Sequence, residues 1–280
     1  MAQVTDNRLA RIDRVSGAMI TAGPFPYART VAVAGGVVWM GGSNQYPATP
    51  FPGSSTLIGV DATSLRVRIQ LSFPGPAQPA IANVAGDSDS LWIAYGASVY
   101  RLWAADGRTL GSRPIGGMAT SIALDPAGKR VYVGLDNVPA VSAATITAFD
   151  APTLTPIVSA TTGGGDLGGP HLAAGAQDVW VSYATGMLGQ VEHRQASNLA
   201  QLPVVSATHT NSVRVFEIGG MVWISDDMAG QVMCLDPRTG AVRASWETQN
   251  GGIVAGDLSQ VYFGDVNGVV GVLKLDARCR

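Results

Sequence analysis

One phrase recurs along almost the whole chain, and it constrains the fold more than any other feature. The phrase is an apolar alternation, then Asp, then two residues, then Ser or Thr, often with Gly. It stands as LARIDRVSG (9–17), TLIGVDATSL (56–65), VYRLWAADGRTL (99–110), TITAFDAPTL (145–154), QVMCLDPRTG (231–240) and GVLKLDARCR (271–280). A degenerate copy, GQVEHRQASN (189–198), has Arg194 where the Asp is expected. With this position as the marker, the repeats are separated by 48, 45, 44, 44, 42 and 40 residues, a regularity that indicates a repeat architecture.

A second phrase, a strand centred on an aromatic residue, falls between the markers. Its copies are VVWMGG (37–42), SLWIAYG (90–96), RVYVGL (130–135), DVWVSY (178–183), MVWISD (221–226) and QVYFGD (260–265). A strand of small residues precedes these copies, and a further strand follows the markers, so one unit holds four short strands. That number of strands in 40–45 residues is typical of a propeller blade. The sequence therefore predicts an all-β fold: a single-domain β-propeller of four-stranded antiparallel blades over residues 1–280.

Composition supports this fold class and excludes several function classes. The chain has 280 residues, of which 35 are Gly and 16 are Pro, so residues that form turns are abundant. A net charge of −2 gives no basic field for nucleic acid, and no stretch reads as a membrane-spanning helix. The first residues lack the apolar core of a signal peptide. We expect an extracellular or periplasmic protein in a mature or trimmed form, with a cytoplasmic location as the alternative.

The number of blades follows from how the ends of the chain pair. Six complete pairs of first and second strands favour six blades, with the N- and C-terminal strands sharing one blade so that no sheet edge stays free. Seven blades is the alternative, and it would leave one blade without its innermost strand. Cys234 and Cys279 are too few for a disulfide framework or a zinc site. Two free thiols is the favoured interpretation, and a single disulfide between them is the alternative.

The recurring residues have expected structural roles. The marker Asp residues should cap their own turns, with Gly taking a positive φ in the same turn. The Trp and Tyr residues of the second strands should fill the space between neighbouring blades. His193, in the degenerate phrase, is expected to be a solvated residue of an outer strand.

Three segments resemble blades of known propellers. PRTGAV (237–242), VWISDDMAGQVMCLD (222–236) and GGPHLAAGAQDVWVSY (168–183) are similar to blades of the YVTN-type and virginiamycin B lyase-like propellers. In the lyase-like propellers, Pro-His recurs at the opening of innermost strands, and the resemblance implies elimination by a general base aided by a metal ion. Pro170-His171 matches that motif, but Gly251-Gly252 stands at the corresponding place in the last blade. His171 is therefore carried over only as a pocket residue.

Candidate site residues gather on one face of the predicted ring. Connections from second to third strands and from one blade to the next open on the same face, and the longest of them, including 161–171, lie there. The predicted ligand-binding residues on this face are Tyr27, Asn44, Asp136, His171, Tyr183, His209, Asp226 and Asp265. His171 and His209 are both expected to open innermost strands of successive blades and to lie in one polar pocket. Asp226 and Asp265 would supply balancing charge there.

The sequence favours a non-catalytic binding module for a small molecule or a protein. It predicts no cofactor, no metal, no nucleic acid and no membrane insertion, and a monomer. The alternative is a propeller enzyme, a lyase or hydrolase of a small cyclic or ester substrate. In that case His171 and His209 would be the acid–base residues.

Overall fold

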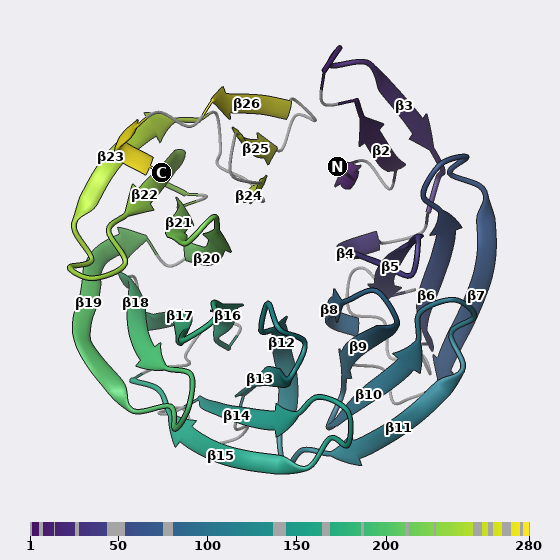
Figure 1. The fold of residues 1–280 in the computed structure, drawn as a ribbon, viewed down its shortest axis with the longest axis horizontal. Coiled ribbons are helices and arrows are strands. Elements are labelled where there is room, and N and C mark those ends of the chain that lie inside the picture. The colour runs from purple at the N-terminus through teal and green to yellow at the C-terminus, as the bar shows by residue number, and fades with distance from the viewer. Residues whose placement is uncertain are drawn as a thin grey trace.

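A computed structural model gives the fold of most of the chain. The described residues are 2–5, 8–13, 15–25, 28–43, 54–74, 81–136, 144–163, 169–185, 188–210, 213–226, 228–248, 254–256, 260–264, 270–274 and 277–279. Strands make up nearly all the regular structure, and within these ranges no helix is long and apolar enough to cross a membrane. The strands form antiparallel sheets that follow one another around a ring (Figure 1).

The strands of each sheet are consecutive in the sequence. The N-terminal sheet has three: β1 (Ala2–Thr5), β2 (Arg8–Ile12) and β3 (Met19–Ala22). Five four-stranded sheets follow: β4 (Ala28–Ala34), β5 (Val37–Ser43), β6 (Ser54–Asp61) and β7 (Val67–Pro74); β8 (Ile81–Gly86), β9 (Ser90–Tyr95), β10 (Ser98–Trp103) and β11 (Thr109–Pro114); β12 (Met118–Leu124), β13 (Arg130–Asp136), β14 (Thr145–Asp150) and β15 (Pro156–Thr161); β16 (His171–Ala174), β17 (Asp178–Thr185), β18 (Leu188–Gln195) and β19 (Gln201–Thr210); β20 (Val213–Ile218), β21 (Met221–Asp226), β22 (Gln231–Leu235) and β23 (Val242–Glu247). The last sheet has β24 (Val254–Gly256), β25 (Gln260–Gly264) and β26 (Val270–Lys274), and the short 3-10 helix η1 (Ala277–Cys279) follows it.

The predicted all-β propeller is confirmed, with six antiparallel blades from β4 to β26 arranged around a ring. The six expected pairs of first and second strands are the first two strands of the six sheets from β4 to β26. At the ends of the chain the described strands pair differently from the expectation. β1, β2 and β3 pair with each other and form a seventh, separate sheet, so the N- and C-terminal strands do not share a blade in the described residues. Antiparallel pairing between strands that follow one another in sequence is favoured over pairing of the two chain ends, because adjacent strands need only a short connection.

The N-terminal sheet is held by side chains against the sheet that follows it. Leu9 of β2 is completely buried and packs in a cluster with Val38, Met40 and Ile58. The Arg11 guanidinium donates a hydrogen bond to the Ala62 carbonyl at 3.4 Å. Strand pairing is therefore not needed to join this sheet to the ring.

The marker residues form one repeated turn, as predicted. In each turn the marker N–H donates to the carbonyl five residues on, and the N–H four residues on donates to the marker carbonyl. Asp61 also caps the turn, because its Oδ1 accepts the Thr63 and Ser64 N–H groups at 3.0 and 2.8 Å. Such bonds favour the carboxylate and lower the pKa of Asp61. The same backbone turn begins at Asp13, Asp61, Trp103, Asp150, Gln195 and Asp236.

Two of the predicted marker positions are wrong. Trp103, not Asp106, begins the turn in one sheet, and Gln195, not Arg194, begins it in another. The residue four places after the marker has a positive φ in all six turns, and in three of them it is Leu65, Leu154 or Leu199 instead of Gly. Each of these three leucines is buried. Apolar burial outweighs the cost of about 1–3 kcal/mol for a strained backbone at these positions.

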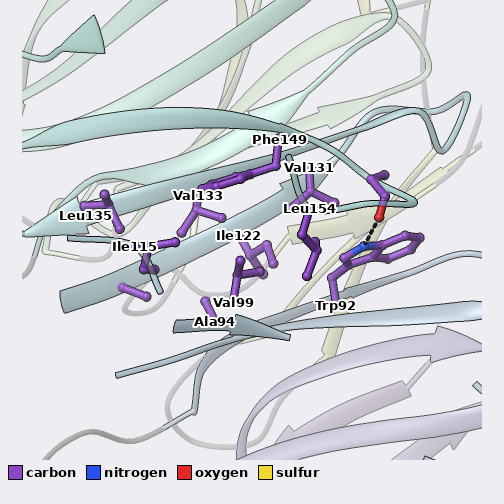
Figure 2. Close-up of a cluster of buried hydrophobic side chains, with 12 residues drawn as sticks. Trp92, Ala94, Val99, Ile115, Ile122, Val131, Val133, Leu135, Phe149 and Leu154 are labelled. Carbon is purple, nitrogen blue, oxygen red and sulfur yellow. Dashed lines mark hydrogen bonds between the residues drawn. The ribbon is translucent and has the colours of Figure 1, made fainter. Parts of the chain in front are cut away.

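Aromatic residues of the second strands join neighbouring sheets, as predicted. Trp39, Trp92, Tyr132, Trp180 and Trp223 are buried. Trp92 Nε1 of β9 also donates to the Ala151 carbonyl in the next sheet at 3.0 Å (Figure 2). Trp39 Nε1 and the Tyr132 hydroxyl make equivalent bonds to Ala104 and Ala196, each one residue after a marker position. The repeat therefore encodes a directional link between sheets as well as apolar packing.

The two cysteines are not free. Cys234 of β22 and Cys279 of η1 form a disulfide, and both are buried. The bond joins η1, which follows the last sheet, to the preceding sheet β20–β23. The interpretation as free thiols is therefore wrong, because the fold brings together two cysteines that are 45 residues apart in sequence.

Candidate axial binding site

Five polar residues occupy one equivalent position on successive innermost strands. Each lies opposite a small residue of the second strand in the pairing register. These five, the axial ring residues, are Thr30 (opposite Gly41), Asn83 (Ala94), Ser121 (Gly134), His171 (Ser182) and Arg214 (Ser225). The innermost strands surround the centre of the ring (Figure 1), and all five residues lie in the first half or at the middle of their strands. They therefore belong to the same end of the axis, the face predicted to bind a ligand.

Three of the axial ring residues, Thr30, Asn83 and Ser121, make hydrogen bonds that join neighbouring sheets. Thr30 Oγ1 donates to Asn83 Oδ1 at 2.5 Å, and the Val84 N–H donates to Thr30 Oγ1 at 3.2 Å. Ser121 Oγ donates to the Pro170 carbonyl at 2.5 Å. These contacts satisfy buried polar groups between neighbouring sheets. His171 and Arg214, both only partly buried, are the titratable members of the axial ring.

His171 and Arg214 lie on neighbouring innermost strands, β16 and β20, at equivalent positions in the pairing register. Burial lowers the pKa of His171 to about 4, and the positive charge of Arg214 contributes to the same shift. At neutral pH the site therefore combines a neutral imidazole with a charged guanidinium. Such a combination offers several hydrogen-bond donors to an anion and carries one positive charge.

The shifted pKa of His171 predicts a loss of stability in acid. Because the unfolded imidazole titrates near pH 6.5 and the folded one near 4, the unfolded chain binds more protons between these values. The free energy of unfolding should therefore fall by up to about 3 kcal/mol as the pH drops from 6.5 to 4. Urea unfolding of the parent and of His171→Gln across this range measures the effect. The variant should lose less stability than the parent, and equal losses would contradict the assignment.

Two of the predicted ligand-binding residues are buried instead of exposed at the rim. Tyr183 is 4% exposed, and its hydroxyl donates to Glu192 Oε1 at 2.6 Å. Asp226 is 2% exposed, and its Oδ1 accepts the Ala229 N–H at 3.0 Å. Asp136 is partly exposed, at the end of β13. Of these three, only Asp136 presents surface to a ligand at the predicted rim.

His209 does not lie where the sequence placed it. It belongs to β19, the outermost strand of its sheet, whereas His171 begins the innermost strand β16 of the same sheet. Three strand spacings, about 14 Å, separate these two strands. The structure therefore does not bring the two histidines together in successive blades. Tyr27, Asn44 and Asp265 lie outside the described residues.

His193 is not the solvated residue that the sequence suggested. Its ring is buried and stacks on Trp180, with centroids 4.1 Å apart and planes inclined by 4°. His193 Nε2 lies 2.7 Å from Asp178 Oδ1. The degenerate phrase thus contributes a packed aromatic pair to the core.

A buried charged network next to His193 was missed altogether. The Arg194 guanidinium contacts Glu192 Oε2 through Nε at 2.9 Å and through a terminal nitrogen at 2.7 Å. Arg194 also donates to the Leu199 and Thr161 carbonyls, and Glu192 accepts the Gly163 N–H at 3.2 Å. Thr161 and Gly163 belong to the preceding sheet and its connection. The network therefore bridges two sheets, and its ionic groups all have partners.

Of the five axial ring residues, only His171 was predicted from the sequence, and Arg214 is the charged residue among the four that were missed. An isolated Arg in VRVFEI (213–218) matches no motif, but alignment of β20 with β16 by register places it opposite Ser225 as His171 lies opposite Ser182. In the described part of the chain no group of three or more His, Cys, Asp or Glu side chains is placed to hold a metal ion.

No family model and no curated protein matches the chain. Among solved structures, it is similar to Kuenenia stuttgartiensis hydrazine synthase, with a TM-score of 0.71 and 9% identity over 96% of this chain and 90% of that chain. It is also similar to a chain of a mitotic checkpoint complex, with a TM-score of 0.71 and 10% identity over 98% of this chain and 83% of that chain. At these identities the likeness concerns the fold alone. By fold, the chain is a β-propeller.

Proposed function

We propose that the chain is a single-domain, non-catalytic binding propeller that holds an anionic group at the axial ring. The observation that carries the proposal is that Arg214 and a neutral His171 stand at equivalent positions on neighbouring innermost strands. An anion bound there would accept charge-assisted hydrogen bonds from Arg214 and a further one from the imidazole N–H. Binding residues commonly lie where a rigid scaffold meets its loops, as at the start of these innermost strands.

Binding is preferred to catalysis because of the acid–base properties of His171. General acid–base catalysis works best with a pKa near the working pH. With a pKa of about 4, His171 is not in its acidic imidazolium form at neutral pH, and its neutral imidazole is a weak base. The same neutral imidazole can still accept a hydrogen bond from a ligand or donate one to it.

The surroundings of the protein and its relatives belong to the same proposal. A buried disulfide supports an extracellular or periplasmic location, since disulfides persist mainly in oxidising compartments. The repeated blade phrases support a place among the YVTN-type and virginiamycin B lyase-like propellers. The anionic group can belong to a small molecule or to a protein surface.

The proposal predicts that citrate, used as a polyanionic probe, binds at the axial ring. Titration at low salt, followed by the imidazole resonances of His171, should give a saturable shift. Loss of a charge-assisted bond worth about 1.5–3 kcal/mol should weaken binding of the Arg214→Gln variant by about tenfold or more. Arg243→Gln on β23, where Arg243 pairs with Asp236 far out on its sheet, is the matched control. Equal affinities of parent and Arg214→Gln would overturn the proposal.

A further inference from the structure

A groove of about 340 Å³ lies between the sheets β8–β11 and β12–β15, away from the axial ring. One wall is the end of β11 and the connection that follows it, with Arg113, Ile115 and Gly116. The other side is one face of β14, with Thr147 and Phe149. Ile115 and Phe149 belong to the buried cluster drawn in Figure 2, so the groove ends on the apolar core between the two sheets.

The groove exists because Thr147 is small. Thr147 lies three residues before a marker position, and the equivalent residues of the other four-stranded sheets are Ile58, Tyr100, Glu192 and Met233. Each of these has a larger side chain. Tyr100, for example, packs against Phe73 of the preceding sheet, with ring centroids 5.6 Å apart. Thr147 bonds instead to Ser159 of its own sheet at 2.9 Å.

The equivalent space between the next two sheets, β12–β15 and β16–β19, shows what such a groove can hold. There, the Glu192 carboxylate accepts the Gly163 N–H from the connection that follows β15. Gly163 and Gly116 are equivalent, because each follows a residue whose N–H donates at 2.9 Å to the carbonyl just before the third strand (Thr162 to Ala144, Ile115 to Ala97). A carboxylate is thus built into one space, and the equivalent place at Gly116 is left to solvent.

The walls of the groove match an acid with an apolar body. The Arg113 side chain makes no ion pair or hydrogen bond with any of the residues that the structure describes, and Gly116 is exposed. Ile115, Leu135 and Phe149 supply an apolar surface beside these polar groups. A volume of about 340 Å³ is at the lower end of the range for small-molecule sites.

We propose that this groove binds a small carboxylic acid, with its carboxylate between Arg113 and the Gly116 N–H and its apolar body on Phe149 and Leu135. The ligand carboxylate would take the place that the Glu192 carboxylate takes in the equivalent space of the next sheet, where it accepts the Gly163 N–H. The positive charge of Arg113 selects an acid over an amine of the same shape. The site is separate from the axial ring and does not depend on it.

Hydrocinnamate is the probe, and hydrocinnamyl alcohol, which has the same body without the charge, is its control. Calorimetric titration of the full chain at neutral pH should show saturable binding of the acid and at least tenfold weaker binding of the alcohol. Arg113→Gln should weaken binding of the acid by about tenfold or more. Thr147→Met, which copies the residue at position 233, should fill the groove and abolish binding.

Two further variants distinguish binding in this groove from binding at the axial ring or at any exposed arginine. Arg68→Gln, on the exposed outer strand β7, and Arg214→Gln, on the axial ring, should both bind hydrocinnamate like the parent. Arg113 is a surface residue, so its variant remains informative even if Thr147→Met does not fold. The proposal is overturned if the acid does not bind at millimolar concentration, if the alcohol binds equally well, or if Arg113→Gln leaves the affinity unchanged.

Discussion

Replacing Arg194 by alanine should lower the free energy of unfolding by about 3–5 kcal/mol. The guanidinium and the Glu192 carboxylate are both almost completely buried, with side chains 6% and 3% exposed. Without Arg194, the carboxylate would keep bonds from the Tyr183 hydroxyl and the Gly163 N–H but would lose its counter-charge. A buried carboxylate without a cation is among the most destabilising single changes. Urea unfolding of the full chain measures the loss.

The neighbouring sheet supplies the control for this change. Met233 and Leu235 occupy the positions that Glu192 and Arg194 occupy one sheet earlier, relative to the marker turn. The double variant Glu192→Met with Arg194→Leu should therefore recover most of the stability that Arg194→Ala loses, because neither charge remains to be buried. A double variant no more stable than Arg194→Ala would show that the network is worth more than its burial cost. A loss below about 1 kcal/mol in Arg194→Ala would mean that the pair is effectively solvated.

The repeat made the sheet architecture predictable because its signals are local. An apolar alternation, an Asp-capped turn and a large aromatic in the second strand each act within one sheet or on its neighbour. The Asp61 turn and the Trp92 packing were both expected from these signals. The hydrogen bond from Trp92 to Ala151 was not, because it depends on the rotation of one sheet against the next.

Register errors account for the markers that were placed wrongly. The turn is defined by its backbone bonds, which begin at Trp103 and Gln195 without an Asp. In the degenerate phrase, the marker position was assigned one residue too early, to Arg194 instead of Gln195. In a strand, that shift exchanges the two faces of the sheet, and Arg194 lies on a buried one. The charged network could not be found from residue type alone.

Of the two residues that carry the proposed axial site, one could be predicted from the sequence. His171 was found because Pro-His precedes an innermost strand, whereas Arg214 has no motif and appears only when the strands are aligned by register. His209 was misplaced because β19 runs for ten residues, up to Thr210, and takes in a segment that was expected to be a loop. The inter-sheet groove follows from one small residue, Thr147, whose effect depends on the bulk of its equivalents elsewhere.

The ends of the chain were the least predictable part. Pairing of β1, β2 and β3 within one sheet removes the shared blade, so something other than strand exchange must hold the last sheet. The disulfide contributes, since the whole sheet β24–β26 lies between Cys234 and Cys279 in the sequence, and Val261 and Leu273 of that sheet also pack in the cluster around Trp223. A count of two cysteines carries no information about their proximity.

Removing this bond should cost about 4 kcal/mol of stability at 25 °C. A cross-link over 45 residues restricts the unfolded chain by about that amount. The double variant Cys234→Ala with Cys279→Ala should therefore unfold at a clearly lower urea concentration than the oxidised parent. Because the bond ties η1 to β22, the last sheet should be the first part to lose protection from amide hydrogen exchange when the bond is removed.

Reduction of the parent distinguishes the stability that the disulfide contributes from the stability that packing of the cysteine side chains contributes. If the cross-link itself stabilises the ring, the reduced parent should unfold close to the double alanine variant, and reductant should leave that variant unchanged. Cys279→Ala alone should behave as the double variant does, since the thiol that remains on Cys234 stays buried and uncharged among Trp223 and its neighbours. A parent whose unfolding midpoint does not move with reductant would show that packing of η1 holds the terminal sheet without the bond.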